Sequence, residues 1–231
     1  MRKYLVFGFL WSLGLVSRLF WRCRIGWIGT EAPRAAWSRL RLVCFLNHTS
    51  LFEWIFVAAP PTNFLWRVAC HGVVPAAAKT ITRPVVGRFF KLLAANVVSI
   101  SRERDHTWRE VLSRIDPDSM VLILPEGRMK RPNGLDSNGQ PMSVRGGIAD
   151  ILEAIPSGEM VIAYSGGLHH VQAPGERLPR LFRTIRMNFE LVEIAAYRAE
   201  RLAEAGSEAG FKRAVVDDLE RRRDLHCPPA S

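Results

Sequence analysis

Residues 120–127 read MVLILPEG and contain the clearest buried-strand pattern in the chain. The apolar run MVLIL has the length and composition of a buried strand, and the Pro-Glu-Gly after it ends the strand in a bend. A second apolar run, LRLVCFL at Leu40–Leu46, is followed by the polar residues Asn47-His48-Thr49-Ser50. Polar chemistry therefore follows each of two strand-like segments directly.

Outward from these two runs, strand-like and helix-like segments alternate along the chain. Further strands are predicted at residues 96–101, 160–164 and 185–191. Helices are predicted at residues 51–59, 85–93, 106–115, 143–155 and 195–225, with a break near Gly206. This alternation predicts an α/β fold: a single domain with a central mixed, mostly parallel sheet flanked by helices. In such sheets, ligands bind where strands end and loops begin.

The composition limits the class of protein. The chain has 231 residues and a net charge of +10, from 32 Lys and Arg against 22 Asp and Glu. One hydrophobic core serves a chain of this length. A basic excess attracts nucleic acid, anionic lipid headgroups or phosphorylated substrates, unless it is only a solvated basic surface. The sequence has no zinc finger, base-stacking signature or helix-turn-helix pattern, so nucleic acid is not an expected partner.

The four cysteines are Cys23, Cys44, Cys70 and Cys227, and no two form a Cys-x-x-Cys pair. We therefore expect reduced thiols in a cytosolic environment. Cys44 beside His48 offers one alternative, a hydrolase with a cysteine nucleophile. Because Cys44 lies inside an apolar run, a core position is the simpler interpretation.

The N-terminus is strongly apolar, and residues 4–21 read YLVFGFLWSLGLVSRLFW. As a helix this segment is about 27 Å long, marginal for a hydrocarbon core of about 30 Å. Cations on both sides, with Trp11 and Trp21, suit a helix that lies on an anionic membrane surface. We predict a membrane-associating segment at residues 1–30 and a main domain at residues 31–231. A signal peptide and a buried core helix are the competing interpretations.

The first polar segment pairs His48 with Glu53, five residues later. A histidine can act as a general base near neutral pH, and a carboxylate can orient its ring and stabilise the imidazolium. Ser50-x-x-Glu53 is also a capping box, in which Glu53 accepts from the Ser50 N–H. The capping role alone would also explain the glutamate, so both roles remain open for Glu53.

The second polar segment begins with Glu126 and Gly127, and Arg128 and Lys130 follow within three positions. Glycine permits close backbone approach, and the cations can hold a phosphate. A charged surface loop is the alternative. Arg102, after the predicted strand at residues 96–101, points to the same edge if the strands are parallel.

Taken in order, these segments resemble the glycerophospholipid acyltransferase family, which includes the lysophosphatidic acid acyltransferases. That family shows Asn-His-x4-Asp, and residues 47–53 match it with Glu53 in place of Asp. Residues 100–102 match the end of its second block. Residues 125–127 match the Pro-Glu-Gly of its third block, Phe-Pro-Glu-Gly-Thr-Arg-Ser. Met129 stands where the family usually has a phosphate-binding arginine.

The resemblance covers about residues 40–165 and makes residues 31–231 an acyltransferase domain. Residues 145–147, Arg-Gly-Gly, also fit the basic residue, glycine and small residue that commonly open a helix in this family. The resemblance implies the catalytic residues His48 and Glu53 and the substrate-binding residues Arg102, Glu126, Gly127, Arg128 and Lys130. It implies no metal and no cofactor.

The implied reaction is direct transfer of a fatty acyl group from acyl-CoA or acyl carrier protein to a hydroxyl, without an acyl-enzyme. The expected acceptor is a lysophospholipid or a glycerol-phosphate-like molecule, used in phospholipid biosynthesis or remodelling. The expected location is the cytoplasmic face of a membrane, the inner membrane of a bacterium. Because of Met129, a phosphate-free lyso-aminolipid is an alternative acceptor. A non-catalytic binder of anionic lipid with the same fold is the alternative from another class.

Overall fold

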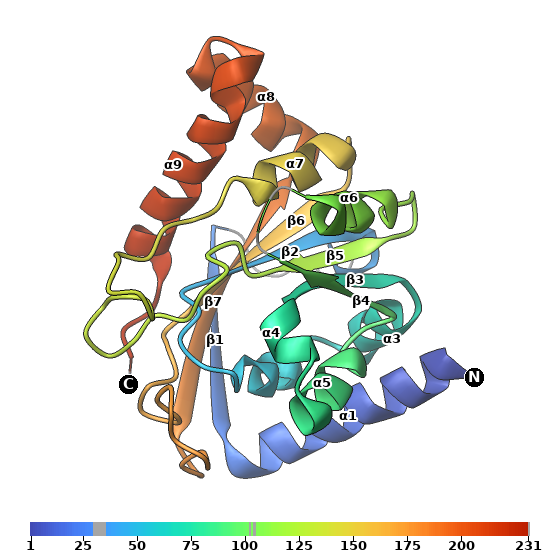
Figure 1. Ribbon diagram of the computed structural model, residues 1–231, viewed down its shortest axis with the longest axis vertical. Coiled ribbons are helices and arrows are strands. Elements are labelled where there is room, and N and C mark those ends of the chain that lie inside the picture. The colour runs from blue at the N-terminus through green and yellow to red at the C-terminus, as the bar shows by residue number, and fades with distance from the viewer. Residues whose placement is uncertain (30–35, 102, 104, 231) are drawn as a thin grey trace.

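The computed structural model describes residues 1–29, 36–101, 103 and 105–230, so Arg102 lies outside the described residues (Figure 1). Its centre is one sheet with the strand order β1-β7-β6-β2-β5-β3-β4. The strands are β1 (Arg22–Ile28), β2 (Leu40–Leu46), β3 (Gly72–Ala77), β4 (Asn96–Ile100), β5 (Met120–Ile123), β6 (Glu159–Ser165) and β7 (Thr184–Glu193). All neighbours pair in parallel except β6 and β7, which are antiparallel. This confirms the predicted α/β class and its mixed, mostly parallel sheet.

Helices cover both faces of the sheet. They are α1 (Arg2–Phe20), α2 (Ala36–Arg39), the 3-10 helix η1 (Glu53–Ala58), α3 (Thr62–His71), α4 (Ala78–Ile81), α5 (Pro84–Lys91), α6 (His106–Ser113), α7 (Gly147–Ala154), α8 (Ile194–Ala205) and α9 (Glu208–His226). One core lies between the sheet and α6, α7, α8 and α9, and the other lies between the sheet and α1, η1 and α3. Because it is covered on both faces, β6 is buried at every position.

Some predicted elements differ from the observed ones. Strands β1 and β3 and helices α2, α3 and α4 were not predicted, and the helix predicted at residues 51–59 is only the 3-10 helix η1. The predicted break near Gly206 is confirmed, because Gly206 adopts the left-handed conformation that ends α8, with φ of 65°.

Helix α1 lies along the body of the protein. Val6 and Leu10 are buried against η1 and α3. A guanidinium near each end donates to a backbone carbonyl, Arg2 to Lys91 O and Arg18 to Ala58 O, each at 3.1 Å. Within the described residues, α1 is the one helix long and apolar enough to cross a membrane. One side of it is packed and the other exposes large apolar side chains, so it is not a core helix buried on all sides.

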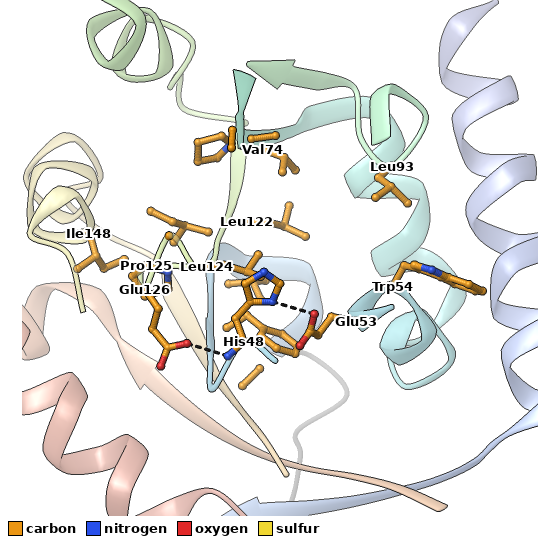
Figure 2. Close-up of a pocket in the computed structure, with 18 of the residues that line it drawn as sticks. His48, Glu53, Trp54, Val74, Leu93, Leu122, Leu124, Pro125, Glu126 and Ile148 are labelled. Atoms are coloured by element: carbon orange, nitrogen blue, oxygen red, sulfur yellow. Dashed lines mark hydrogen bonds and ion pairs between the residues drawn. The ribbon is translucent and has the colours of Figure 1, made fainter. Parts of the chain in front are cut away.

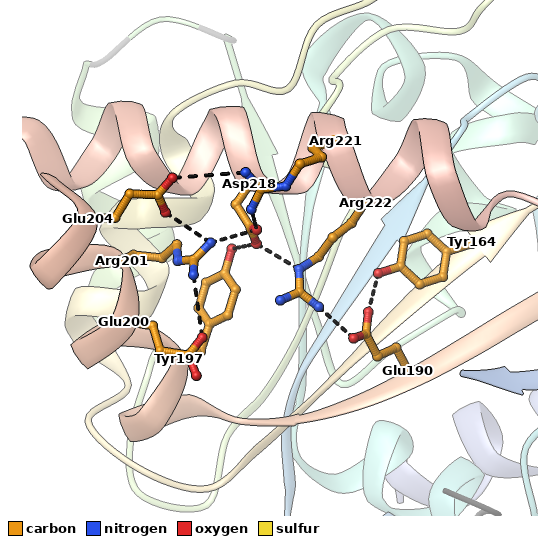
Figure 3. A network of polar contacts seen from close by, with 9 residues as sticks. All are labelled: Tyr164, Glu190, Tyr197, Glu200, Arg201, Glu204, Asp218, Arg221 and Arg222. Carbon is orange, nitrogen blue, oxygen red and sulfur yellow. Dashed lines mark hydrogen bonds and ion pairs between the residues drawn. The ribbon is translucent and has the colours of Figure 1, made fainter. Parts of the chain in front are cut away.

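A buried polar network joins α8 and α9 to the sheet (Figure 3). Asp218 of α9 is 1% exposed and accepts from Tyr197 Oη at 2.8 Å. Its carboxylate also contacts Arg201 Nη1 at 2.6 Å and Arg222 Nε at 2.8 Å. Arg222 continues to Glu190 of β7 at 2.5 Å. Burial of one carboxylate among these donors fixes α9 against the sheet.

Replacing Asp218 by alanine leaves two partly buried guanidinium groups without their shared carboxylate. We expect Asp218→Ala to lower the free energy of unfolding by about 3 kcal/mol, the cost of breaking a buried ion pair from one side. Urea denaturation followed by circular dichroism measures it. Asp217→Ala, which removes an exposed pair with Arg213, is the matched control and should cost less than about 1 kcal/mol. Equal losses of unfolding free energy in the two variants would contradict the role given to Asp218 in holding α9 against the sheet.

Candidate active site

The turn after β2 places His48 at the carboxyl end of the sheet. Asn47 has a left-handed backbone with φ of 63°, which asparagine tolerates better than most residues. Its side-chain amide donates to Ser165 O, at the end of β6, at 2.8 Å. Leu168 N donates to Thr49 Oγ1 at 2.7 Å and holds the turn from the far side. His48 is thereby fixed between the ends of β2, β5 and β6.

Glu53 contacts both the His48 ring and the backbone of the turn. Its Oε2 lies 2.8 Å from His48 Nδ1, and its Oε1 accepts from Thr49 N at 2.7 Å and from Ser50 N at 3.0 Å. Glu53 therefore bonds the backbone of the turn with one oxygen and the histidine with the other. Only this half of the predicted capping box is formed, because Ser50 Oγ accepts from Phe52 N at 3.2 Å and η1 has no side-chain cap. The His48 side chain is 15% exposed and the Glu53 side chain 9%. Because Nδ1 faces Glu53, Nε2 is the ring nitrogen that would act on a substrate (Figure 2).

The Pro-Glu-Gly bend meets this turn from β5. Glu126 is 2% exposed, and its Oε2 accepts from His48 N at 2.7 Å. Its Oε1 lies 3.3 Å from Arg223 Nη1 of α9, and that guanidinium also donates to Met142 O at 3.3 Å. Gly127 takes the left-handed conformation, with φ of 64°, that turns the chain at this point. Oε2 of Glu126 thus holds the backbone of His48 in place, and Oε1 joins the bend to α9.

Arg223 was missed by the sequence analysis. It lies 97 positions after Glu126, on a helix whose charges resemble those of a solvated surface. No local spacing signals the contact, because it depends on how α9 crosses the sheet. In Figure 1, α9 runs beside the carboxyl ends of the strands, which brings its last turns to the bend.

Of the cations predicted to bind a phosphate, Arg128 lines the cavity and Lys130 does not. Arg128 lines the cavity beside His48, but its guanidinium pairs with Asp136. Backbone N–H groups of the 136–140 turn and this guanidinium lower the pKa of Asp136 to about 2. Lys130 bonds through its backbone, its N to His48 O and its O to His169 Nε2, each at 2.7 Å. Among the residues that the structure describes, those lining the cavity do not include Lys130.

Two cations that were not predicted as ligands do line the cavity. Arg145 lines the cavity beside the Pro125–Gly127 bend, and its backbone N–H donates to Pro125 O at 2.8 Å. Its side chain lies over Gly127, where an added Cβ would be 3.9 Å from Arg145 Cγ. Lys212 of α9 approaches so closely that a Cβ at Gly146 would overlap it, and its Nζ lies 3.6 Å from Asp150. The motif at residues 145–147 therefore shapes the polar end of the cavity.

The cavity measures about 900 Å³ and is mainly apolar. Residues of the sheet, of α1, η1, α3, α4 and α5, and of α6, α7 and α9 line it, and His48 lies among them (Figure 2). Its apolar walls include Leu10, Trp54, Phe64, Val74, Leu93 and Leu122. Such a shape suits an alkyl chain with its reactive end at the histidine.

Cys44 faces the opposite core and is fully buried. Burial raises the pKa of its thiol well above the ordinary value, which disfavours a thiolate nucleophile. Within the described residues, no group of three or more His, Cys, Asp and Glu side chains could hold a metal ion. The expectation of a metal-free reaction stays a prediction.

Comparison with known proteins agrees with this geometry. A family model described as Acyltransferase matches residues 29–164, more than half of the chain. The crystal structure of the 1-acyl-sn-glycerophosphate (LPA) acyltransferase PlsC from Thermotoga maritima has a TM-score of 0.58 and 16% sequence identity. The match covers 96% of this chain and 81% of that one, and at this identity it shows a shared fold. A search of the curated proteins found no match. With both strand-end motifs inside the matched region, the chain belongs to the acyltransferase family.

Proposed function

We propose that this protein transfers a fatty acyl group from acyl-CoA or acyl carrier protein to a hydroxyl of a lysophospholipid or glycerol-phosphate-like acceptor. One observation carries the proposal: the His48–Glu53 pair lines a large, mainly apolar cavity. The likeness to the PlsC fold supports the same substrate class. A non-catalytic lipid binder would not need the 2.8 Å contact between Glu53 and the ring, since only the other oxygen bonds the backbone of the turn.

In the proposed reaction, His48 Nε2 takes the proton from the acceptor hydroxyl as its oxygen attacks the thioester carbon. Glu53 holds the Nδ1–H and stabilises the imidazolium that forms. The carbon–sulfur bond then breaks, and the thiolate leaves with the proton from His48. An ester forms and a thiol is released, so no acyl-enzyme is needed. An alkyl tail occupies the apolar part of the cavity.

Arg145 is the cation that best fits the acceptor phosphate. Arg128 is already paired with Asp136, and position 129 is an uncharged methionine. Arg145 lines the cavity over Gly127, next to the bend that holds His48. The neutralised Arg128 is also the observation that keeps a phosphate-free lyso-aminolipid as the second candidate acceptor.

The enzyme works at a membrane surface, on the cytoplasmic face, with α1 lying in the surface. Arg2 and Arg18 fasten α1 to the body near its two ends, and its inner side packs on α3 and η1. Its outer side exposes Leu5, Trp11, Leu15 and Leu19, each at least half exposed. A helix with one apolar side packed on protein and the other exposed suits interfacial binding better than a crossing.

Removing the base tests the reaction. We expect His48→Ala to lower kcat by about 10²- to 10⁴-fold, the usual contribution of general-base catalysis. Glu53→Gln should also lower kcat, because the amide cannot stabilise the imidazolium. The assay presents lysolipids with acyl-CoA or acyl carrier protein and detects products by mass spectrometry. Cys44→Ala is the control and should keep its activity. Loss of activity in Cys44→Ala with full activity in His48→Ala would overturn the mechanism.

Arg223 should act as a positioning residue through Glu126. We expect Arg223→Ala to lower kcat by about tenfold to a hundredfold, because a small displacement of His48 is enough to slow the reaction. Arg223→Lys should recover part of the loss. A double-mutant cycle with Glu126→Gln should be strongly non-additive. Arg213→Ala, exposed on the same helix, serves as the control. Additive effects would show that Arg223 acts independently of the bend.

Arg145 should affect binding of the phosphate more than the chemical step. We expect Arg145→Gln to raise KM for a lysophosphatidic acceptor by about tenfold or more, the loss of one charge-assisted hydrogen bond, with a smaller change in kcat. A phosphate-free lysolipid should show no such rise. Arg131→Gln, an exposed neighbour, is the matched control. An equal rise in KM for both acceptors would remove Arg145 from the phosphate site.

A further inference from the structure

The loop at residues 166–183, between β6 and β7, exposes apolar side chains although its backbone is well anchored. Arg180 N donates to Val171 O and Phe182 N donates to Phe20 O, each at 2.7 Å. Trp21 Nε1 donates to Arg180 O at 3.1 Å. The loop is thus tied to itself and to the end of α1. The loop tip, defined here as Leu178, Leu181 and Phe182, is nevertheless 81%, 43% and 68% exposed.

Phe182 is held outward by an unusual backbone. Its φ is 59°, in the left-handed region that a bulky side chain rarely adopts. Strain of this kind persists where the surrounding structure enforces it and often marks a functional segment. Its ring centroid lies 6.0 Å from that of Phe20, at the end of α1. The fold therefore presents this aromatic ring to the outside instead of burying it.

The loop tip continues the outer side of α1. Figure 1 shows the loop in orange and α1 in blue at the same lower edge of the molecule. On α1, Leu15 and Leu19 are 56% and 68% exposed, within one turn or two of Phe20. The contact between Phe20 and Phe182 joins the two elements. Together they form one apolar surface built from segments more than 150 positions apart in the sequence.

Cations border the loop tip. Arg177, Arg180 and Arg183 are exposed within the loop, and Arg22 is exposed at the start of β1. Glu176 pairs with Arg180 at 2.5 Å, so the loop keeps a positive excess. Exposed apolar side chains ringed by arginines fit a lipid surface with anionic headgroups, where the apolar groups enter the acyl boundary. A protein partner with an acidic rim would need the same charges, but it would not explain the continuity with α1.

We infer that the 166–183 loop is a second membrane-contact element, whose tip inserts Leu178, Leu181 and Phe182 into an anionic bilayer beside α1. The inference rests on the proposed membrane association of α1. The base of the same loop holds the turn of the active site, through Leu168 N on Thr49 Oγ1 and His169 Nε2 on Lys130 O. Insertion of the tip therefore sets the height and tilt of His48 above the lipid surface.

The test uses the full chain and vesicles that contain phosphatidylglycerol and phosphatidylcholine, with flotation as the readout. We expect Leu178→Ser/Leu181→Ser/Phe182→Ser to lower vesicle partitioning by at least about tenfold, because three apolar side chains leave the bilayer. Leu178→Ser/Leu181→Ser, which keeps the contact between Phe182 and Phe20, should give most of the loss. Leu225→Ser, 73% exposed on α9, is the matched control and should bind as the unaltered chain does.

A second set of variants in the same vesicle experiment tests the arginines of the loop. Arg177→Gln/Arg183→Gln should weaken binding to vesicles with phosphatidylglycerol and leave weak binding to pure phosphatidylcholine unchanged. Turnover of a monomeric short-chain lysolipid should stay within twofold in every loop variant, whereas turnover of a vesicle-borne lysolipid should fall. Circular dichroism and melting temperature verify that each variant is folded.

Several outcomes would overturn the inference. One is vesicle binding of both apolar variants within twofold of the unaltered chain while Leu15→Ser/Leu19→Ser on α1 loses binding. Another is a dimer that the triple variant dissociates with vesicle binding unchanged, which would assign the tip to a second copy of the chain. Flotation needs no turnover, so failure of the acyltransferase assay and failure of the loop inference are separately visible.

Discussion

The site depends on how the Glu53 carboxylate is divided between two tasks. One oxygen bonds two backbone N–H groups of the turn after β2, and the other faces the His48 ring. The turn and the ring orientation are therefore set by the same buried group. From the other side, Glu126 bonds the backbone N–H of His48, so two carboxylates from neighbouring strand ends fix one residue. Parallel pairing of β2 with β5 brings these strand ends together.

Two largely buried carboxylates next to an apolar cavity require compensation, because burying an unpaired charge is costly. Backbone N–H groups compensate Glu53, and Arg223 compensates Glu126. Arg223 in turn depends on the position of α9, which the Asp218 network fastens to the sheet. The C-terminal helices lie beyond the region matched by the family model, yet they complete the support of the histidine.

The sequence predicted those parts of the molecule whose signals are local. The apolar runs of β2 and β5 and the polar residues after them were visible as patterns, and so was the break at Gly206. Strand β3 was missed because Gly72 and Pro75 resemble strand breakers, although the sheet accommodates them. The spacing also could not distinguish Lys130, which is held by its backbone outside the cavity, from Arg145, which lines it. Such distinctions depend on the crossing of distant elements.

The proposed mechanism requires that Glu53 keep His48 in the tautomer with the proton on Nδ1, so that Nε2 can accept a proton from an alcohol. Nitrogen-15 NMR of protein labelled in its histidine rings measures this directly at neutral pH, with His48→Asn used to assign the signal. We expect a protonated, hydrogen-bonded Nδ1 and an unprotonated Nε2 at His48, with the Nδ1 proton signal shifted in Glu53→Gln. A neutral ring protonated on Nε2, or a spectrum unaffected by Glu53→Gln, would contradict it.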